Sequence, residues 1–127
     1  MRYLTVTVAV ALALLIGAGV YCTLYSKRVS DDYKALAAQV ERDARLEAWP
    51  SAQEKALRLA AAWRETGDVL SMWVNHADVD DVTIALSRLQ IALEMRDAAE
   101  SLSIIAELNE NLSHIYHRDS LSLKNVF

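Results

Sequence analysis

Residues that interrupt helices are scarce in this chain. Its 127 residues include three glycines and one proline, and beyond residue 28 only Gly67 and Pro50 remain. Alanine, leucine, glutamate and arginine, which favour helices, are abundant in the same region. We therefore expect an all-α fold with short connections between its helices.

Cysteine is nearly absent, and basic residues do not cluster. The one cysteine is Cys22, so no disulfide can form within the chain, and the redox compartment stays open. Residues 29–127 contain ten Lys or Arg and 17 Asp or Glu, a formal net charge of −7. Because phosphate groups are bound by clustered basic side chains, this balance argues against nucleic acid as a partner.

One long hydrophobic run contrasts with these absences. From Tyr3 to Tyr25 there are 23 consecutive positions without a charged side chain, opened by Arg2 and followed by Lys27 and Arg28. As a helix this run reaches roughly 33 Å, enough to cross a bilayer core of about 30 Å. Tyrosine rings at both ends suit the two water interfaces. The run predicts a single-pass transmembrane helix and a location in the cell membrane.

The chain divides accordingly into three parts. We expect a transmembrane anchor with short flanks over residues 1–28 and a helical bundle domain over residues 29–119. Residues 120–127 alternate polar and apolar side chains, so we expect an extended tail packed on the bundle. A cleaved secretory signal that ends near residues 17–19 is an alternative, which would leave a secreted helical protein.

Two opposing signals bear on the side of the membrane where the domain lies. Lys27, Arg28 and Lys34 after the span outnumber Arg2 and the terminal amine before it, which favours a cytoplasmic domain. A two-residue tail, one early apolar helix and a single following domain are instead typical of an uncleaved signal anchor. Such an anchor exports the domain behind it, so we expect the domain to be extracytoplasmic.

Apolar periodicity and helix-end signals divide the soluble part into about four helices. The first covers residues 31–48 and can continue directly from the span. It ends before Pro50, because proline disfavours a helical residue before it. Ser51 and Glu54 form a capping box for the second helix, which reaches about Val74.

A break over residues 75–80 precedes the third helix, with Asp78 or Asp80 as its N-cap. Asp97 and Glu100 repeat the capping-box pattern at the start of the fourth. The apolar stripes of the four helices are Val29, Tyr33, Leu36 and Val40; Ala52, Ala56, Leu59, Trp63, Leu70 and Trp73; Val82, Leu86, Leu89 and Leu93; and Leu102, Ile105, Leu108, Leu112 and Ile115. Short connections between the helices predict an up-and-down bundle.

Two sets of polar residues are candidates for a site. Histidines and carboxylates at helical spacing can bind zinc, and the candidates are His76, Asp78, Asp80, His114 and His117. Helix caps and solvent-exposed positions account for these residues better, so we expect neither a metal nor a cofactor. The second set is a candidate polar cluster for interaction or structure, in which Arg88 pairs with an acid near the break or with Asp97; its members are Asn75, His76, Asp78, Arg88 and Asp97.

The remaining residues give no catalytic geometry. Ser113 precedes His114, but adjacent side chains on a helix point about 100° apart, so this pair cannot act as nucleophile and base. We expect no enzymatic activity.

Small residues line one face of the span. Ala9, Ala13 and Gly17 recur every four residues, and such a pattern allows two membrane helices to approach closely. This face predicts packing against another membrane protein or against a second copy of the chain.

Several short motifs resemble a known family. They are Trp49, Trp63, Trp73, residues 75–80, residues 86–89, Asp97 and the ending 121–126. Together they resemble DUF4363, an uncharacterised family of small single-span bacterial proteins. The resemblance implies a membrane-anchored, all-helical protein, chiefly from Gram-positive bacteria, and it implies no activity. Asp78 departs from the family pattern, in which we expect Glu.

These observations favour a membrane-tethered helical module that acts through protein–protein contacts. One alternative is a ligand- or metal-sensing domain whose site lies near His76, Asp80 and His114. The other is the secreted helical protein that signal cleavage would produce.

Overall fold

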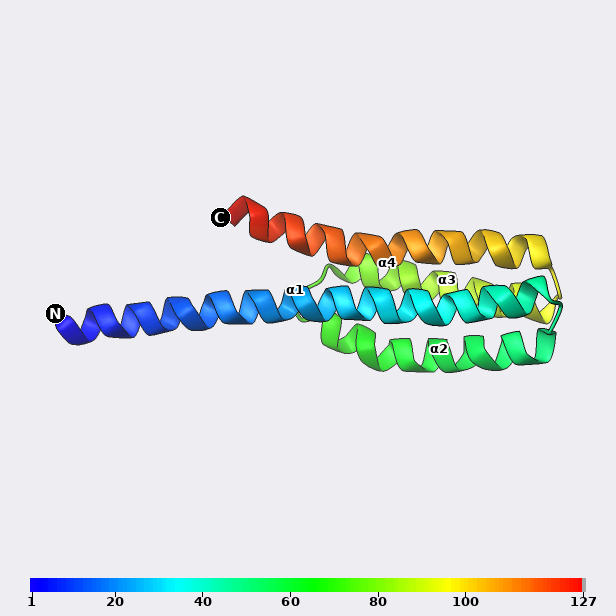
Figure 1. Ribbon diagram of the computed structural model, residues 1–127, viewed down its shortest axis with the longest axis horizontal. Helices are drawn as coiled ribbons and strands as arrows, with labels where there is room; N and C mark the ends of the chain where they lie inside the picture. Colours follow the sequence, from blue (N-terminus) through cyan, green and yellow to red (C-terminus); the bar gives the residue numbers. More distant parts are fainter. Residues whose placement is uncertain (127) are drawn as a thin grey trace.

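The computed structural model describes the backbone of residues 1–126 and the side chains of residues 1–116. Over that backbone range the chain forms four helices and no strand (Figure 1). The helices are α1 (Arg2–Arg45), α2 (Trp49–Leu70), α3 (His76–Glu94) and α4 (Ala98–Val126). The expected all-α fold is therefore confirmed.

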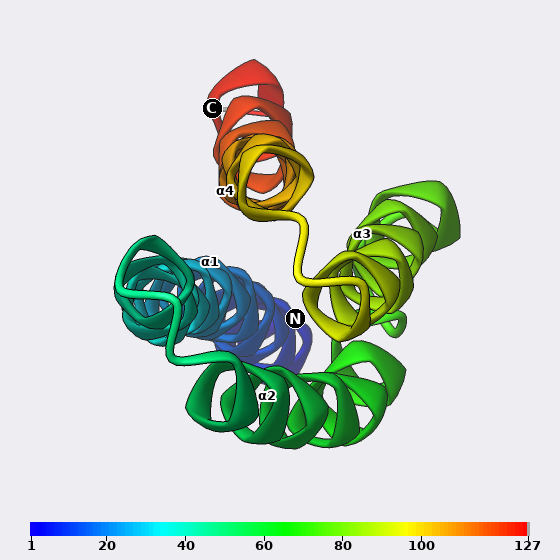
Figure 2. The same cartoon turned by 90° about the vertical axis from the view of Figure 1, so that its right-hand side faces the viewer.

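The four helices form an up-and-down bundle, as expected. Each runs antiparallel to the one before it (Figure 1). Viewed end on, they form a ring in which α1 and α3 each contact both α2 and α4 (Figure 2). Residues 46–48, 71–75 and 95–97 make the connections. Because these connections are short, consecutive helices must lie side by side.

Helix α1 is the longest element, with 44 residues, and only its second half belongs to the bundle. Its first half extends away from the other helices (Figure 1). This half is long and apolar enough to cross a membrane, and its most hydrophobic stretch has no buried residue. The first buried side chain is Ser26, and the helix continues into the bundle without a break. The structure thus fits an N-terminal transmembrane helix that leads directly into a bundle.

The core of the bundle is made of the apolar stripes that face inward on all four helices. Most of the expected positions are buried. Leu36 is an exception at 41% exposed, because Ala37 takes the inward position with 0% exposed. On α4, Ile104 is buried beside Ile105, whereas Leu102 is only half-buried. At these points the residues of α1 and α4 that face the core therefore lie one position away from the predicted stripes.

Polar contacts tie α2 to both of its neighbours. The Tyr33 hydroxyl of α1 lies 2.8 Å from Thr66 Oγ1 of α2, and the Tyr33 ring meets Trp63 edge to face with centroids 5.1 Å apart. Burial raises the pKa of the Tyr33 phenol, so it stays a neutral hydroxyl at physiological pH. Trp63 Nε1 in turn donates to Thr83 Oγ1 of α3 at 3.1 Å. These bonds satisfy polar atoms that the core partly buries and fix the register of three helices.

Helix α4 is tied to its two neighbours in a similar way. Lys34 Nζ of α1 donates to Ser113 Oγ at 2.5 Å. Arg88 of α3 pairs with Glu107 at 2.8 Å and with Glu100 at 3.5 Å. The Arg88 side chain is 47% exposed, so these ion pairs contribute little to stability and chiefly favour one register.

The two connections farthest from the span share one backbone geometry. After α1, Glu47 has a φ of 57°, its N–H donates to Ala44 O at 3.1 Å, and the Ala48 N–H donates to Asp43 O at 2.8 Å. After α3, Arg96 has a φ of 54° and the equivalent two bonds are present. Both are Schellman motifs, in which a left-handed residue ends the helix and satisfies its last carbonyls.

Some expected helix boundaries are wrong. Helices α1 and α2 end at Arg45 and Leu70, three or four residues earlier than expected. Helix α4 continues through Val126, so the backbone of residues 120–126 is helical and not extended. The side chains of that segment, and hence its predicted packing on the bundle, lie outside the described residues.

The start of α2 corrects the capping box expected at Ser51. The helix begins two residues earlier, with Pro50 in its first turn, a position where the missing N–H of proline costs nothing. Ser51 therefore lies inside the helix, and its hydroxyl donates across to Asp43 Oδ2 of α1 at 2.7 Å.

The cap expected for α3 is wrong, and the Asp97 half of the capping box expected for α4 is confirmed. Asp78 and Asp80 lie inside α3, whose N-cap is Asn75; the Asn75 side chain accepts a bond from the Ala77 N–H at 3.0 Å. Before α4, Asp97 Oδ1 accepts from the backbone N–H three residues later at 3.0 Å.

Candidate functional site

The small-residue face of the span is open in this chain. Ala9, Ala13 and Gly17 are all exposed, and a Cβ built on Gly17 would meet nothing within 4 Å. The bundle therefore leaves this face free to contact another membrane helix. Association through it stays a prediction.

The expected polar cluster is split between the two ends of α3. Asn75, His76 and Asp78 lie where α3 begins, near the span, whereas Asp97 follows its other end. Arg88 lies in the half of α3 nearer Asp97 and shares a shallow groove with it. Arg88 forms its ion pairs with Glu107 and Glu100 of α4, and not with Asp97 or an acid near the break as expected.

The metal candidates are also separated. His76 and Asp80 line a groove between α2 and α3. His114 lies on α4, with Nε2 3.9 Å from Glu110 Oε1, and the side chain of His117 lies outside the described residues. Among the described side chains, no group of three or more His, Cys, Asp or Glu is placed to hold a metal ion.

The groove between α2 and α3 is the largest of the described hollows, at about 500 Å³. Gly67 allows this close approach of the helices, because a Cβ there would lie 3.0 Å from Val79 Cγ1. The groove is lined by polar side chains of both signs over an aromatic floor; they are Arg64, Asp68, Ser71, His76, Asp80 and Thr83, with Trp63, Gly67 and Val79 beneath. Such a lining suits a small ligand that carries both charges.

A row of exposed apolar residues follows the outer face of α3. Ile84, Ile91 and Met95 are 56%, 58% and 75% exposed. Their spacings of seven and four residues place them on one face of the helix, as in the seam of a coiled coil. Arg88 lies between them and borders the shallow groove beside α4.

An ion pair with a hydroxyl partner closes the far end of the bundle. Lys55 Nζ of α2 lies 2.8 Å from Asp43 Oδ2, the same oxygen that accepts from the Ser51 hydroxyl. The hydrogen bonds from Lys55 and then from Ser51 hold the pKa of Asp43 below its ordinary value. This cluster joins α1 to the first turns of α2 and has a structural role.

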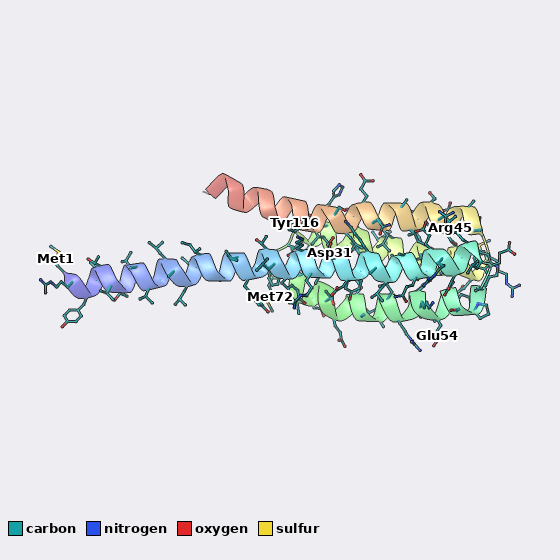
Figure 3. All side chains as sticks on the ribbon, in the orientation of Figure 1. Met1, Asp31, Arg45, Glu54, Met72 and Tyr116 are labelled. Carbon is teal, nitrogen blue, oxygen red and sulfur yellow. The ribbon has the colours of Figure 1, made fainter. Side chains whose placement is uncertain are left out.

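At the opposite end, aromatic residues join the α2–α3 connection to α1. Trp73 Nε1 donates to Ser26 Oγ at 3.0 Å, and the Trp73 ring meets Tyr25 edge to face with centroids 5.6 Å apart. Tyr21 stacks on Tyr25 one turn earlier, with centroids 6.3 Å apart. Met72 beside Trp73 is 81% exposed, and Figure 3 shows it at the end of the bundle from which the span extends.

Sequence reasoning had named Trp73 as a core residue and Tyr25 as an interface residue, but not their contact. The two residues are far apart in the chain, and no periodic pattern relates them. The uncharged segment 69–74 was not a sufficient signal, because residues 82–87 and 101–106 also carry no charge.

The structure defines an all-helical protein in which one apolar N-terminal helix continues into a four-helix bundle. The chain belongs to the family described as domain of unknown function DUF4363, whose model matches residues 20–126. This confirms the resemblance drawn from the sequence motifs. The match covers the bundle and the last turns of the span, so it leaves membrane anchoring untested. No curated protein and no solved structure matches the chain.

Proposed function

We propose that this protein is a membrane-tethered helical module that acts by contacting another protein, with its bundle on the extracytoplasmic side. The observation that carries the proposal is the unbroken α1, which runs from the apolar span into the core of the bundle. Since no linker separates the two parts, the bundle has a fixed height above the bilayer. A tether of this kind suits a domain that must present one face to a neighbour.

The face presented to the partner is the outer face of α3. Ile84, Ile91 and Met95 form an apolar row there, and rows of this spacing favour docking of a second helix. The neighbouring Arg88, which is paired with Glu107 and Glu100, borders this row with polar groups, as is usual at the rim of an interface.

Photo-crosslinking in native membranes tests the partner face. A photoreactive residue in place of Ile91 should give a discrete adduct, and the further change Ile84→Glu should abolish it. Leu57 of α2 is the matched control, because it is an apolar side chain that is 59% exposed on another face. Equal adducts from both positions, or none from Ile91, would refute the α3 face.

The tether and the orientation need separate measurements. Alkaline carbonate should leave the chain in the membrane pellet, and an intact mass that includes residues 1–19 would exclude signal cleavage. In a Cys22→Ser background, Glu54→Cys places a thiol on an exposed side chain far from the span (Figure 3). Labelling of intact cells by an impermeant maleimide is expected; labelling only after lysis would place the bundle in the cytoplasm.

A second candidate function rests on the groove between α2 and α3. Because basic and acidic side chains, Arg64 and His76 with Asp68 and Asp80, line the same groove, it suits a small zwitterion, and the domain would then sense a free amino acid or short peptide. A thermal-shift screen of the full chain in detergent against amino acids and dipeptides tests this. A ligand that binds the native state must raise Tm, and the rise should vanish with Arg64→Gln.

A further inference from the structure

The α2–α3 connection lies at the height where the bilayer surface is expected. Tyr25 is 11 residues beyond Leu14, the middle of the uncharged run, and is therefore about 16 Å along the helix from that midpoint. Half of a typical hydrocarbon core is about 15 Å. Tyr25 and Ser26 thus reach the boundary between hydrocarbon and headgroups. Trp73 donates a hydrogen bond to Ser26, and its ring contacts the ring of Tyr25.

The composition of the connection also fits a lipid surface. Residues 69–74 read Val-Leu-Ser-Met-Trp-Val and carry no charge. Met72 is 81% exposed and Val69 is 39% exposed. Tryptophan is enriched at membrane interfaces because its ring prefers the apolar side and its N–H a polar partner, which here is Ser26.

Charge on α1 completes the arrangement. Lys27 and Arg28 are exposed and follow directly after Ser26, where basic side chains can reach anionic headgroups. The unbroken helix leaves no slack between the span and these residues. A bundle held this low must bring its near end to the bilayer.

We propose that the α2–α3 connection is a second membrane contact, in which Met72 and Trp73 enter the headgroup region of the leaflet from which α1 emerges. The occupant of this apolar end is therefore lipid. The contact stops the bundle from tilting about the end of the span and determines which way the α3 face points. This inference rests on the proposed membrane tether.

Depth-resolved quenching of a fluorophore tests the contact. The full chain, with Cys22→Ser and Met72→Cys, is labelled with an environment-sensitive fluorophore and placed in vesicles of phosphatidylcholine with a minor fraction of phosphatidylglycerol. Lipids with a nitroxide at a shallow acyl position should quench the label, and iodide should quench it several-fold less than a label at Leu57→Cys. Leu57 is a matched control because it is 59% exposed but lies 13 residues before Leu70 on α2, about 20 Å from the bilayer.

A charge at the contact gives an independent readout. With the label moved to Val69→Cys, Met72→Glu should raise iodide quenching several-fold, because a carboxylate disfavours the interface, whereas Met72→Leu should leave it unchanged. Equal iodide quenching at residues 72 and 57, in a chain that carbonate does not extract, would overturn the contact and leave the tether intact. That outcome would mark the exposed apolar end as a surface for protein. Extraction by carbonate would instead overturn the tether, and the contact with it.

Discussion

At the scale of single residues, two side chains hold a backbone conformation that glycine adopts more easily. Glu47 and Arg96 end α1 and α3 with φ values of 57° and 54°. Left-handed backbone costs an L-residue roughly 1–2 kcal/mol, and glycine avoids most of that cost. Each of Glu47→Gly and Arg96→Gly should therefore stabilise the bundle by about 1 kcal/mol in urea unfolding of the full chain in detergent.

The two variants should gain by similar amounts. Glu47 and Arg96 each lie between the C-terminus of one helix and the N-terminus of the next, so the two helix dipoles act on their charges in opposite directions. Glu65→Gly, at an exposed position inside α2, is the control and should lose about 0.5–1 kcal/mol. A loss of stability in both turn variants would contradict the strain argument.

The Asp43 cluster predicts an acid dependence of stability. Because Lys55 and Ser51 lower the pKa of Asp43 in the folded state, the folded bundle favours the carboxylate more than the unfolded chain does. Its contribution is complete above the ordinary pKa of about 3.8 and is lost as the pH falls through the lower folded value. Asp43→Asn should flatten the fall in unfolding free energy below about pH 5, measured against wild type. Parallel curves for the two proteins would show that the cluster contributes nothing.

Sequence could predict some of these residues and not others. The Asp97 cap was predictable, because both of its bonding groups lie within one local motif. Ser51 was wrongly predicted to cap α2, because its hydroxyl donates to Asp43 of α1 and does not cap the N-terminus of α2. Asn75, Asp78 and Asp80 are all residue types that favour the N-cap, and the local sequence does not show that α3 begins after the first of them.

At the scale of helices, Gly67 controls how closely α2 and α3 approach. A Cβ at this position would lie 3.0 Å from Val79 Cγ1, so Gly67→Ala gains helix propensity of about 1 kcal/mol but crowds Val79. We expect the single variant to be near neutral. In a Val79→Ala background the crowding is absent, and the same change should stabilise by about 1 kcal/mol.

Urea unfolding of the four proteins in this double-mutant cycle supplies the measurement. Gly67→Leu provides a further check, because overpacking between two packed helices typically costs about 1–3 kcal/mol. An identical effect of Gly67→Ala in both backgrounds would mean that the two helices do not meet closely at this point.

Helix number, order and inward faces were predictable because each follows from a local period. The prediction of the apolar stripe of α3 is confirmed, because Val82, Leu86 and Leu89 are all buried. On α1 the pattern allowed either Leu36 or Ala37 to face inward, and the larger residue was the wrong choice. Tertiary packing decided between them: Leu36 lies in a hollow between α1 and α2 beside Leu59, and periodicity contains no information on such neighbours.

At the scale of the whole molecule, α1 supplies both the apolar N-terminal stretch and one of the four helices of the bundle. Sequence could predict the span, the bundle and their continuity, because each depends on composition along the chain. It could not predict that the α2–α3 connection lies level with Tyr25 and Ser26 of α1. That placement follows from the hydrogen bond between Trp73 and Ser26, which are 47 residues apart in sequence.

Because α1 belongs to both the proposed span and the bundle, lengthening it between these two parts should move the bundle away from the membrane without unfolding it. Seven helix-forming residues that include Glu and Lys, inserted after Tyr21, add two turns and about 10 Å, with a net rotation of only about 20°. The α2–α3 connection keeps its contacts with Tyr25 and Ser26, so the free energy of unfolding should stay the same. A fluorophore at Met72→Cys should move into water, and iodide should then quench it as strongly as a label at Leu57→Cys.

The same seven residues inserted directly after Met1 make the matched control. They lie on the other side of the span, so they leave the distance between the bilayer and the bundle unchanged, and the label at residue 72 should stay shielded from iodide. Continued shielding in the Tyr21 insertion as well would show that protein, not lipid, covers Met72. Loss of shielding in the Tyr21 insertion alone would show that the length of α1 fixes where the bundle meets the bilayer.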